Sequence, residues 1–284
     1  MLVHGVTGRA NQDPLLVHLA RSLAALGFRC VVPSLRYLSC FCHDPRDIVT
    51  LIEAIDAAAQ LSDNVVAVLA FSYGASYALS AAADPRVSTL CSDLVGFGAY
   101  YDLSDALEFQ RKLLLRNPRI EDDDADLAYL RYTLLACHRA ELDLPTEAWK
   151  EFDPILVNFT SPRPISQIRS PLLRFARDVD FVGLMHAYQH RNHSKTLSPA
   201  GVLSALRCTV GLLHDPDDRF VPPEHVERIR AVLDARPSAL PAAVLTTAML
   251  SHVQVNPLRR ILDLPRLIAV LEPILGRRPP TTRP

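Results

Sequence analysis

The segment over residues 65–83 constrains the fold of this chain more than any other part. Residues 65–69 are an uninterrupted apolar run, which is typical of a strand buried on both faces. Residues 75–83 are mostly small and favour a helix. Between them stands Ala70-Phe71-Ser72-Tyr73-Gly74, whose small residues allow a strand and a helix to approach closely. The segment therefore predicts a strand, a sharp turn at Ser72 and a helix.

Strand and helix signals alternate along most of the chain. Asp13 and Pro14 suit the start of a helix and Gly27 suits its end, because these residue types are preferred at those positions. Alternation with short links is typical of a parallel sheet with right-handed crossovers. We therefore predict an α/β fold, a mostly parallel sheet flanked by helices. The predicted strands are residues 1–3, 28–32, 65–69, 90–97, 208–213 and 243–249, and further helices are expected at residues 46–61, at 222–233 and after Asn256.

Residues 101–201 interrupt this alternation. They contain no clear buried strand, and helices are predicted at residues 103–115, 125–139 and 174–190. About one hundred residues is too long for a loop inside a compact domain. We therefore predict a helical cap or lid insertion at 101–201. The α/β core is then formed by residues 1–100 and 202–276, and residues 277–284 are expected to be a disordered tail.

The composition argues against several classes of protein. A net charge of −1 over 284 residues provides no broad attraction to nucleic acid or to anionic membranes. The six cysteines are too sparse for a disulfide scaffold, and the segment Cys40-Phe41-Cys42-His43 lacks the ligand spacing of a zinc site. His186, His190 and His193 are better explained as one polar face of a helix than as metal ligands. No signal peptide or bilayer-spanning run is visible, so we expect a cytoplasmic protein. We also expect neither a metal nor an organic cofactor.

Three polar residues follow predicted strands in a suggestive order. A serine hydroxyl becomes a good nucleophile near neutral pH only when a base takes its proton and a carboxylate orients that base. Asp218 follows the strand at 208–213, and His252 follows the last strand. Both are therefore expected at the same sheet edge as Ser72, which is where ligands meet an open α/β sheet. The backbone N–H groups of Val6 and Tyr73 are the candidate donors to a substrate oxyanion.

These parts of the sequence resemble the α/β-hydrolase family. The resemblance extends over nearly the whole chain, and its motifs occur in family order: Leu2-Val3-His4-Gly5, Ala70-Phe71-Ser72-Tyr73-Gly74, the segment at 213–222 and Ser251-His252. It implies that Ser72 is the nucleophile, Asp218 the acid and His252 the base. It also implies that Val6 and Tyr73 form the oxyanion hole and that the insertion is a cap.

The sequence departs from the family pattern in three places. Ala70 stands where the first glycine of the serine motif is usual, as in some lipases of the family. Asp215 stands where a glycine is common, so the acid is one of Asp215, Asp217 and Asp218. Asp218 is preferred because Val221-Pro222 follows it at the family's offset. The strands that normally precede the His-Gly strand are missing, which suggests a truncated N-terminus.

The expected function is that of a serine esterase acting on a small, apolar acyl substrate. An acyltransferase, or a hydrolase of amides, thioesters or peptides, would use the same three residues. A non-catalytic ligand-binding protein of the same fold would be expected to have a damaged set of three, and this set looks intact. The natural substrate and the oligomeric state stay open.

Overall fold

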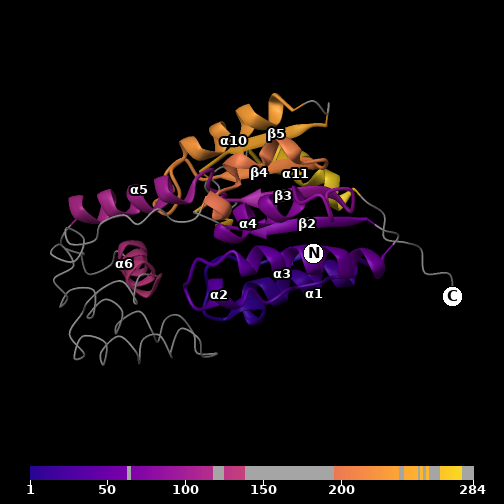
Figure 1. Ribbon diagram of the computed structural model, residues 1–284, viewed down its shortest axis with the longest axis horizontal. Helices are drawn as coiled ribbons and strands as arrows, with labels where there is room; N and C mark the ends of the chain where they lie inside the picture. Colours follow the sequence, from indigo (N-terminus) through magenta and orange to yellow (C-terminus); the bar gives the residue numbers. More distant parts are fainter. Residues whose placement is uncertain are drawn as a thin grey trace.

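A parallel sheet of five strands forms the centre of the molecule (Figure 1). The computed structural model describes residues 1–62, 65–117, 125–137, 195–236, 240–248, 250–251, 254–255 and 263–276. Each strand of the sheet pairs in parallel with its neighbour in chain order. The strands are β1 (Leu2–Val3), β2 (Val66–Phe71), β3 (Cys91–Phe97), β4 (Thr209–His214) and β5 (Ala242–Thr246). The predicted fold class is confirmed: a parallel sheet flanked by helices.

Helices cover both faces of this sheet and enclose two hydrophobic clusters. One cluster packs α3 (Arg46–Gln60), α4 (Tyr73–Ala82) and α10 (Glu224–Asp234) against the sheet. The other cluster packs α1 (Pro14–Ala25) and α11 (Leu264–Leu275) against the opposite face. Burial on both faces explains why the central strands are continuous apolar runs in the sequence.

The predicted helix boundaries are confirmed where the sequence supplied capping residues. The Asp13 carboxylate accepts hydrogen bonds from the N–H groups of Leu15 and Leu16 and so begins α1. Gly27 follows the end of that helix with a φ of 91°, a conformation that glycine adopts without steric cost. The short helix α2 (Arg36–Ser39), which was not predicted, follows shortly afterwards.

Two strand predictions differ from the structure. Residues 28–32 form no strand and are joined to the sheet by a hydrogen bond from Leu2 N–H to Val31 O, of 2.9 Å. The neighbouring strand β1 contains only two residues, so it offers too few backbone groups for a regular ladder. The predicted last strand at 243–249 ends at Thr246, and a separate antiparallel pair follows, β6 (Leu250–Ser251) and β7 (Gln254–Val255).

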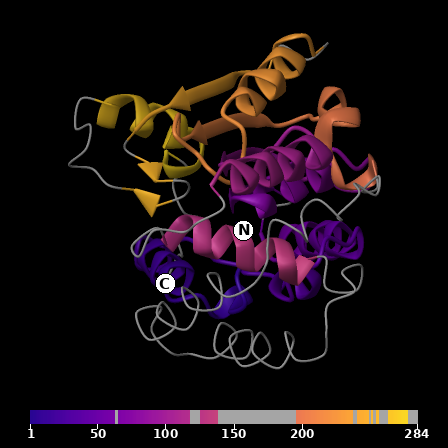
Figure 2. The same cartoon turned by 90° about the vertical axis from the view of Figure 1, so that its left-hand side faces the viewer.

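Two helices of the predicted insertion lie beyond one end of the sheet (Figures 1 and 2). They are α5 (Leu103–Arg116) and α6 (Ala125–Cys137), and both match the predicted helices closely. The third predicted helix, at 174–190, lies outside the described residues, as do the predicted tail and much of the insertion. The domain boundaries therefore stay a prediction.

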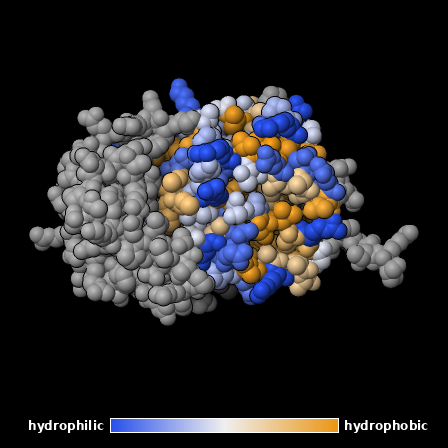
Figure 3. Space-filling model, turned by 60° about the horizontal axis from the view of Figure 1, so that its bottom comes forward, coloured by the Kyte–Doolittle hydropathy of each residue, from blue (hydrophilic) through white to orange (hydrophobic). Residues whose placement is uncertain are grey.

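The lower side of the molecule in Figure 1 carries α1, α2 and α3. Figure 3 shows hydrophobic residues in small groups among hydrophilic ones on this side, a mixture that is normal for a globular protein. Among the described residues, no helix combines the length and the apolar character needed to cross a membrane.

Candidate active site

The turn between β2 and α4 holds Ser72 in an unusual backbone conformation. Its φ is 54° and its ψ is −134°, a combination that residues with a side chain rarely adopt. The Ser72 N–H donates a hydrogen bond of 2.6 Å to Phe97 O at the end of β3, and the residue is 7% exposed. Backbone strain of this kind persists only where the surroundings enforce it, and it is found most often at functional sites.

The loop after β1 packs directly against this turn. A Cβ atom added to Gly74 would lie 2.0 Å from the carbonyl oxygen of His4, and one added to Gly5 would lie 2.9 Å from the Cβ of Ser72. Both positions therefore require glycine because two backbones come into contact there. Ala70, by contrast, is fully buried in β2, where its methyl group fits.

The two candidate oxyanion donors belong to the two segments that meet at Ser72. Tyr73 is the first residue of α4, where backbone N–H groups point out of the helix end. Val6 follows Gly5 in the loop that touches the Ser72 side chain, and its carbonyl accepts a 3.0 Å hydrogen bond from the Tyr129 hydroxyl of α6. Tyr73 therefore adjoins Ser72, and Val6 adjoins the glycine that contacts it; their role as oxyanion donors stays a prediction.

A buried histidine holds the loop after β1 in place. Nδ1 of His4 donates to Gly5 O at 2.7 Å, and Nε2 accepts the Leu35 N–H at 3.0 Å, which identifies the neutral tautomer. Burial lowers the pKa of His4, and the hydrogen bond to Gly5 only partly opposes this effect. The sequence contained His4 in a recognised motif, but it did not indicate this fastening role.

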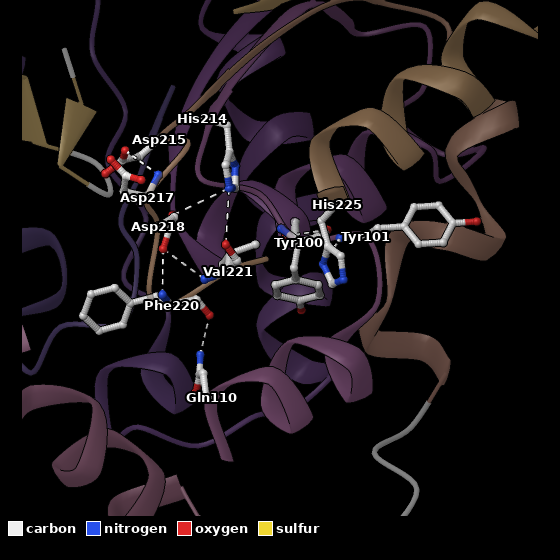
Figure 4. A network of polar contacts seen from close by, with 11 residues as sticks. Tyr100, Tyr101, Gln110, His214, Asp215, Asp217, Asp218, Phe220, Val221 and His225 are labelled. Atoms are coloured by element: carbon white, nitrogen blue, oxygen red, sulfur yellow. Dashed lines mark hydrogen bonds and ion pairs between the residues drawn. The ribbon is translucent and has the colours of Figure 1, made fainter. Parts of the chain in front are cut away.

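The loop after β4 presents Asp218 in a buried, strongly hydrogen-bonded state (Figure 4). Asp218 is 4% exposed, and its Oδ1 accepts the N–H groups of Phe220 at 2.7 Å and Val221 at 3.0 Å. Its Oδ2 lies 3.8 Å from Nε2 of His214, which is itself 3.3 Å from Val221 O. The carboxylate is therefore fixed in one orientation by the backbone of its own loop.

The two alternative carboxylates are held differently. Asp215 is buried and accepts the Asp217 N–H at 3.0 Å, whereas Asp217 is exposed. A carboxylate that orients a catalytic base works best when it is buried, so the geometry favours Asp218 or Asp215 over Asp217. His252, the predicted base, falls between β6 and β7 and lies outside the described residues.

Gln110 of α5 is a site residue that the sequence reasoning missed. Its Nε2 lies 2.7 Å from the Tyr73 hydroxyl and 2.6 Å from Phe220 O. It therefore joins the Ser72 turn to the loop after β4, residues 215–222, which is called the acid loop below because it carries the candidate acid Asp218. Nothing in the sequence indicated this role, because Gln110 is separated by 110 positions from Phe220 and belongs to the insertion.

The comparisons with known proteins support the fold. No family model and no curated protein matches the chain. A structure of a putative hydrolase from Legionella pneumophila is similar over 95% of this chain and 79% of its own, with a TM-score of 0.56 and 13% identity. An esterase of Pyrococcus furiosus is similar over 95% of this chain and 80% of its own, with a TM-score of 0.54 and 12% identity. A serine hydrolase of Cycloclasticus zankles covers 95% and 89%, with a TM-score of 0.50 and 14% identity. Together with the sheet topology, these likenesses show that the chain has the α/β-hydrolase fold.

Proposed function

We propose that this protein is a serine hydrolase that cleaves a carboxylic ester through an acyl-enzyme on Ser72. The observation that carries the proposal is the strained backbone of Ser72 at the end of β2. A turn of this kind raises the hydroxyl above the carboxyl edge of the sheet and places it at a helix N-terminus, where negative charge is stabilised. The three solved structures with the same fold carry the names hydrolase and esterase, which supports the same class of reaction.

In the proposed reaction, His252 takes the proton of the Ser72 hydroxyl while the serine oxygen attacks the ester carbonyl. The N–H groups of Val6 and Tyr73 stabilise the oxyanion, and Asp218 orients the base and stabilises its protonated form. The carbon–oxygen bond to the alcohol then breaks, and the alcohol leaves with the proton from His252. Water activated by the same base attacks the acyl-enzyme and releases the acid, which restores Ser72.

Side chains from the insertion support an apolar acyl substrate. The Tyr129 ring of α6 contacts the Phe220 ring of the acid loop with centroids 6.0 Å apart, and Tyr132 of the same helix packs against Phe41 at 5.2 Å. These aromatic contacts attach α6 to the loop after β4 and to the segment after α2, and they give this part of the molecule an apolar character.

The decisive experiment is labelling with a fluorophosphonate, which reacts covalently with an activated serine. Wild-type protein is expected to be labelled, and Ser72→Ala and His252→Ala are expected not to be. Ser80→Ala is the matched control. It lies on the same helix α4, and its Oγ has no hydrogen-bond partner within the part of the chain that the structure describes. Absence of Ser72-dependent labelling in folded protein would contradict the proposal.

A substrate panel then separates esters from other acyl compounds. Initial rates on p-nitrophenyl esters of increasing chain length are compared with the matching anilides and thioesters, and with transfer to added alcohols. The proposal predicts that esters are cleaved fastest and that water is the main acceptor. Faster cleavage of anilides or thioesters, or predominant transfer to alcohols, would change the substrate class while leaving Ser72 as the nucleophile.

A further inference from the structure

A buried glutamine joins the two loops that hold the proposed nucleophile and acid. Gln110 is 4% exposed, and its Nε2 is within hydrogen-bond distance of the Tyr73 hydroxyl and of Phe220 O. Figure 4 shows the side chain rising from α5 to the carbonyl of Phe220. The amide nitrogen, and not the amide oxygen, faces Phe220 O, because a carbonyl oxygen can only accept a hydrogen bond.

Both partners of Gln110 are adjacent to proposed catalytic groups. Tyr73 directly follows Ser72 and supplies a proposed oxyanion N–H. Phe220 donates its N–H to Asp218 Oδ1 at 2.7 Å, while its carbonyl accepts from Gln110 at 2.6 Å. One amide group thus acts on the nucleophile turn and, through the backbone of Phe220, on the acid.

The packing of α5 does not require a polar residue at this position. Its buried face otherwise contains Leu103, Ala106, Leu107 and Leu114, which supply the apolar contacts. Burying an amide costs free energy unless its hydrogen-bonding groups find partners, and the two N–H groups of Gln110 have the two loops as partners. A hydrophobic residue here would supply neither of these hydrogen bonds, so the glutamine is explained by what it holds.

We propose that Gln110 is a positioning residue that sets the distance and orientation of the acid loop relative to the Ser72 turn. The inference rests on the proposed function, and it makes α5 of the insertion a part of the catalytic apparatus rather than only a cover. Small displacements of catalytic groups are costly to the rate, so a single pair of hydrogen bonds is sufficient to matter.

The test compares Gln110→Met and Gln110→Glu with wild type on a p-nitrophenyl ester. Met has a similar length and no donor. Glu keeps the original shape, and burial beside the Phe220 carbonyl oxygen favours its protonated form, which has one donor. The concentration of active sites is titrated with a fluorophosphonate, and kcat is expressed per titrated site. Lys112→Gln is the control, because Lys112 belongs to the same helix but its side chain is exposed, with Nζ 3.4 Å from Glu108.

The expected result is a fall in kcat per titrated site of about 10- to 100-fold for Gln110→Met, with a smaller fall for Gln110→Glu and little change in KM. The acid limb of the kcat/KM profile should also move to lower pH, since a displaced Asp218 raises the pKa of the base less. Lys112→Gln should match wild type. A residue that serves only the stability of the fold would lower the number of titrated sites without moving the profile.

An unchanged kcat per titrated site and an unchanged pH profile in folded variants would overturn this inference alone. If Gln110→Met lacks native circular dichroism, Gln110→Glu decides by the same two readouts. Failure of the wild-type protein to be labelled at Ser72 is a different result, because it would overturn the proposed function itself.

Discussion

The two loops on either side of the candidate site are held in place by different physical means. Besides one backbone hydrogen bond, from Ser72 N–H to Phe97 O, the Ser72 turn is fixed by steric contact: Gly74 and Gly5 lie so close to neighbouring backbone or to Ser72 that neither can accept a methyl group. The acid loop is fixed by hydrogen bonds instead. The Asp218 carboxylate, the His214 ring and the Gln110 amide each bind its backbone.

The two means of holding a loop differ in how they respond to a substitution and in which parts of the chain they involve. An atom added at a close contact forces the backbone to shift, because close-packed atoms repel steeply. A network of several hydrogen bonds can lose one bond and keep the others. The steric contacts join the loop after β1 to the Ser72 turn, and both of these segments belong to the predicted core. The polar network extends to the insertion, so the geometry of the acid loop depends on a distant part of the chain.

The largest effect is expected for Asp218→Asn, which removes the negative charge of the carboxylate in the loop that is held by hydrogen bonds. Asn can still accept the N–H groups of Phe220 and Val221, so the loop should fold, but it cannot stabilise a protonated base. We expect kcat on a p-nitrophenyl ester to fall about 10³- to 10⁴-fold. Asp215→Asn is the control and should leave kcat unchanged; the reverse ranking would transfer the role of the acid to Asp215.

Gly74→Ala tests the steric contact that holds the Ser72 turn against the loop after β1. The new methyl group would meet the His4 carbonyl, so either the turn or the loop after β1 must shift. We expect a loss of about 1–3 kcal/mol in the free energy of unfolding and a fall in kcat of about 100-fold. Gly201→Ala, where an added Cβ would meet no non-adjacent atom within 4 Å, should change neither quantity. Near-normal kcat and stability in Gly74→Ala, measured by urea unfolding and ester hydrolysis, would show that this contact is not a constraint.

Steric contacts do not depend on pH, whereas a hydrogen bond to an ionisable side chain does. The hydrogen bond of His225 makes this contrast measurable as a pH dependence of stability. Its Nδ1 accepts the Tyr101 N–H at 3.1 Å and joins α10 to the start of the insertion (Figure 4). Burial, followed by the nearby Arg228 charge, lowers the pKa of His225 to about 4. Opposing negative charges come from Asp105, Glu224 and Asp102.

The sign of the pH dependence follows from this depressed pKa. The neutral ring stabilises the fold fully above the unfolded value near 6.5, and this contribution is lost as the pH falls towards 4. Between pH 7.5 and 4.5 the free energy of unfolding should therefore fall by roughly 2–3 kcal/mol through this residue. Urea unfolding of His225→Gln should show a correspondingly weaker pH dependence. An equal dependence in the variant and the wild type would contradict the assignment.

The smallest effect is expected for Tyr129→Phe, which removes one polar contact of the loop after β1 and leaves its steric contacts and the hydrogen bonds of His4 in place. The variant loses the hydroxyl that donates to Val6 O but keeps the ring that contacts Phe220. We expect a decrease in kcat of about 3- to 10-fold, in proportion to one neutral hydrogen bond. A decrease as large as that of Asp218→Asn would mean that the loop after β1 depends on polar fastening as strongly as the acid loop does.

The sequence by itself determined most of the architecture. Continuous apolar runs predicted β2, β3 and β4, and capping residues predicted α1, because these signals depend on local chemistry. The small residues around Ser72 likewise predicted the sharp turn that the structure contains. The strand expected at 28–32 failed because a strand needs a partner of sufficient length, and β1 supplies two residues.

Only the tertiary structure decided how the site is assembled. The fastening of His4 to Leu35 and the bridge made by Gln110 join residues that are far apart in the chain, and no periodicity or motif records such contacts. Hydrogen bonds between distant side chains and backbones depend on the exact approach of packed elements, which local preferences do not specify. The catalytic roles of Ser72, Asp218 and His252 stay predictions of the sequence. The structure adds the strained backbone of the turn that carries Ser72 and the hydrogen bonds that orient Asp218.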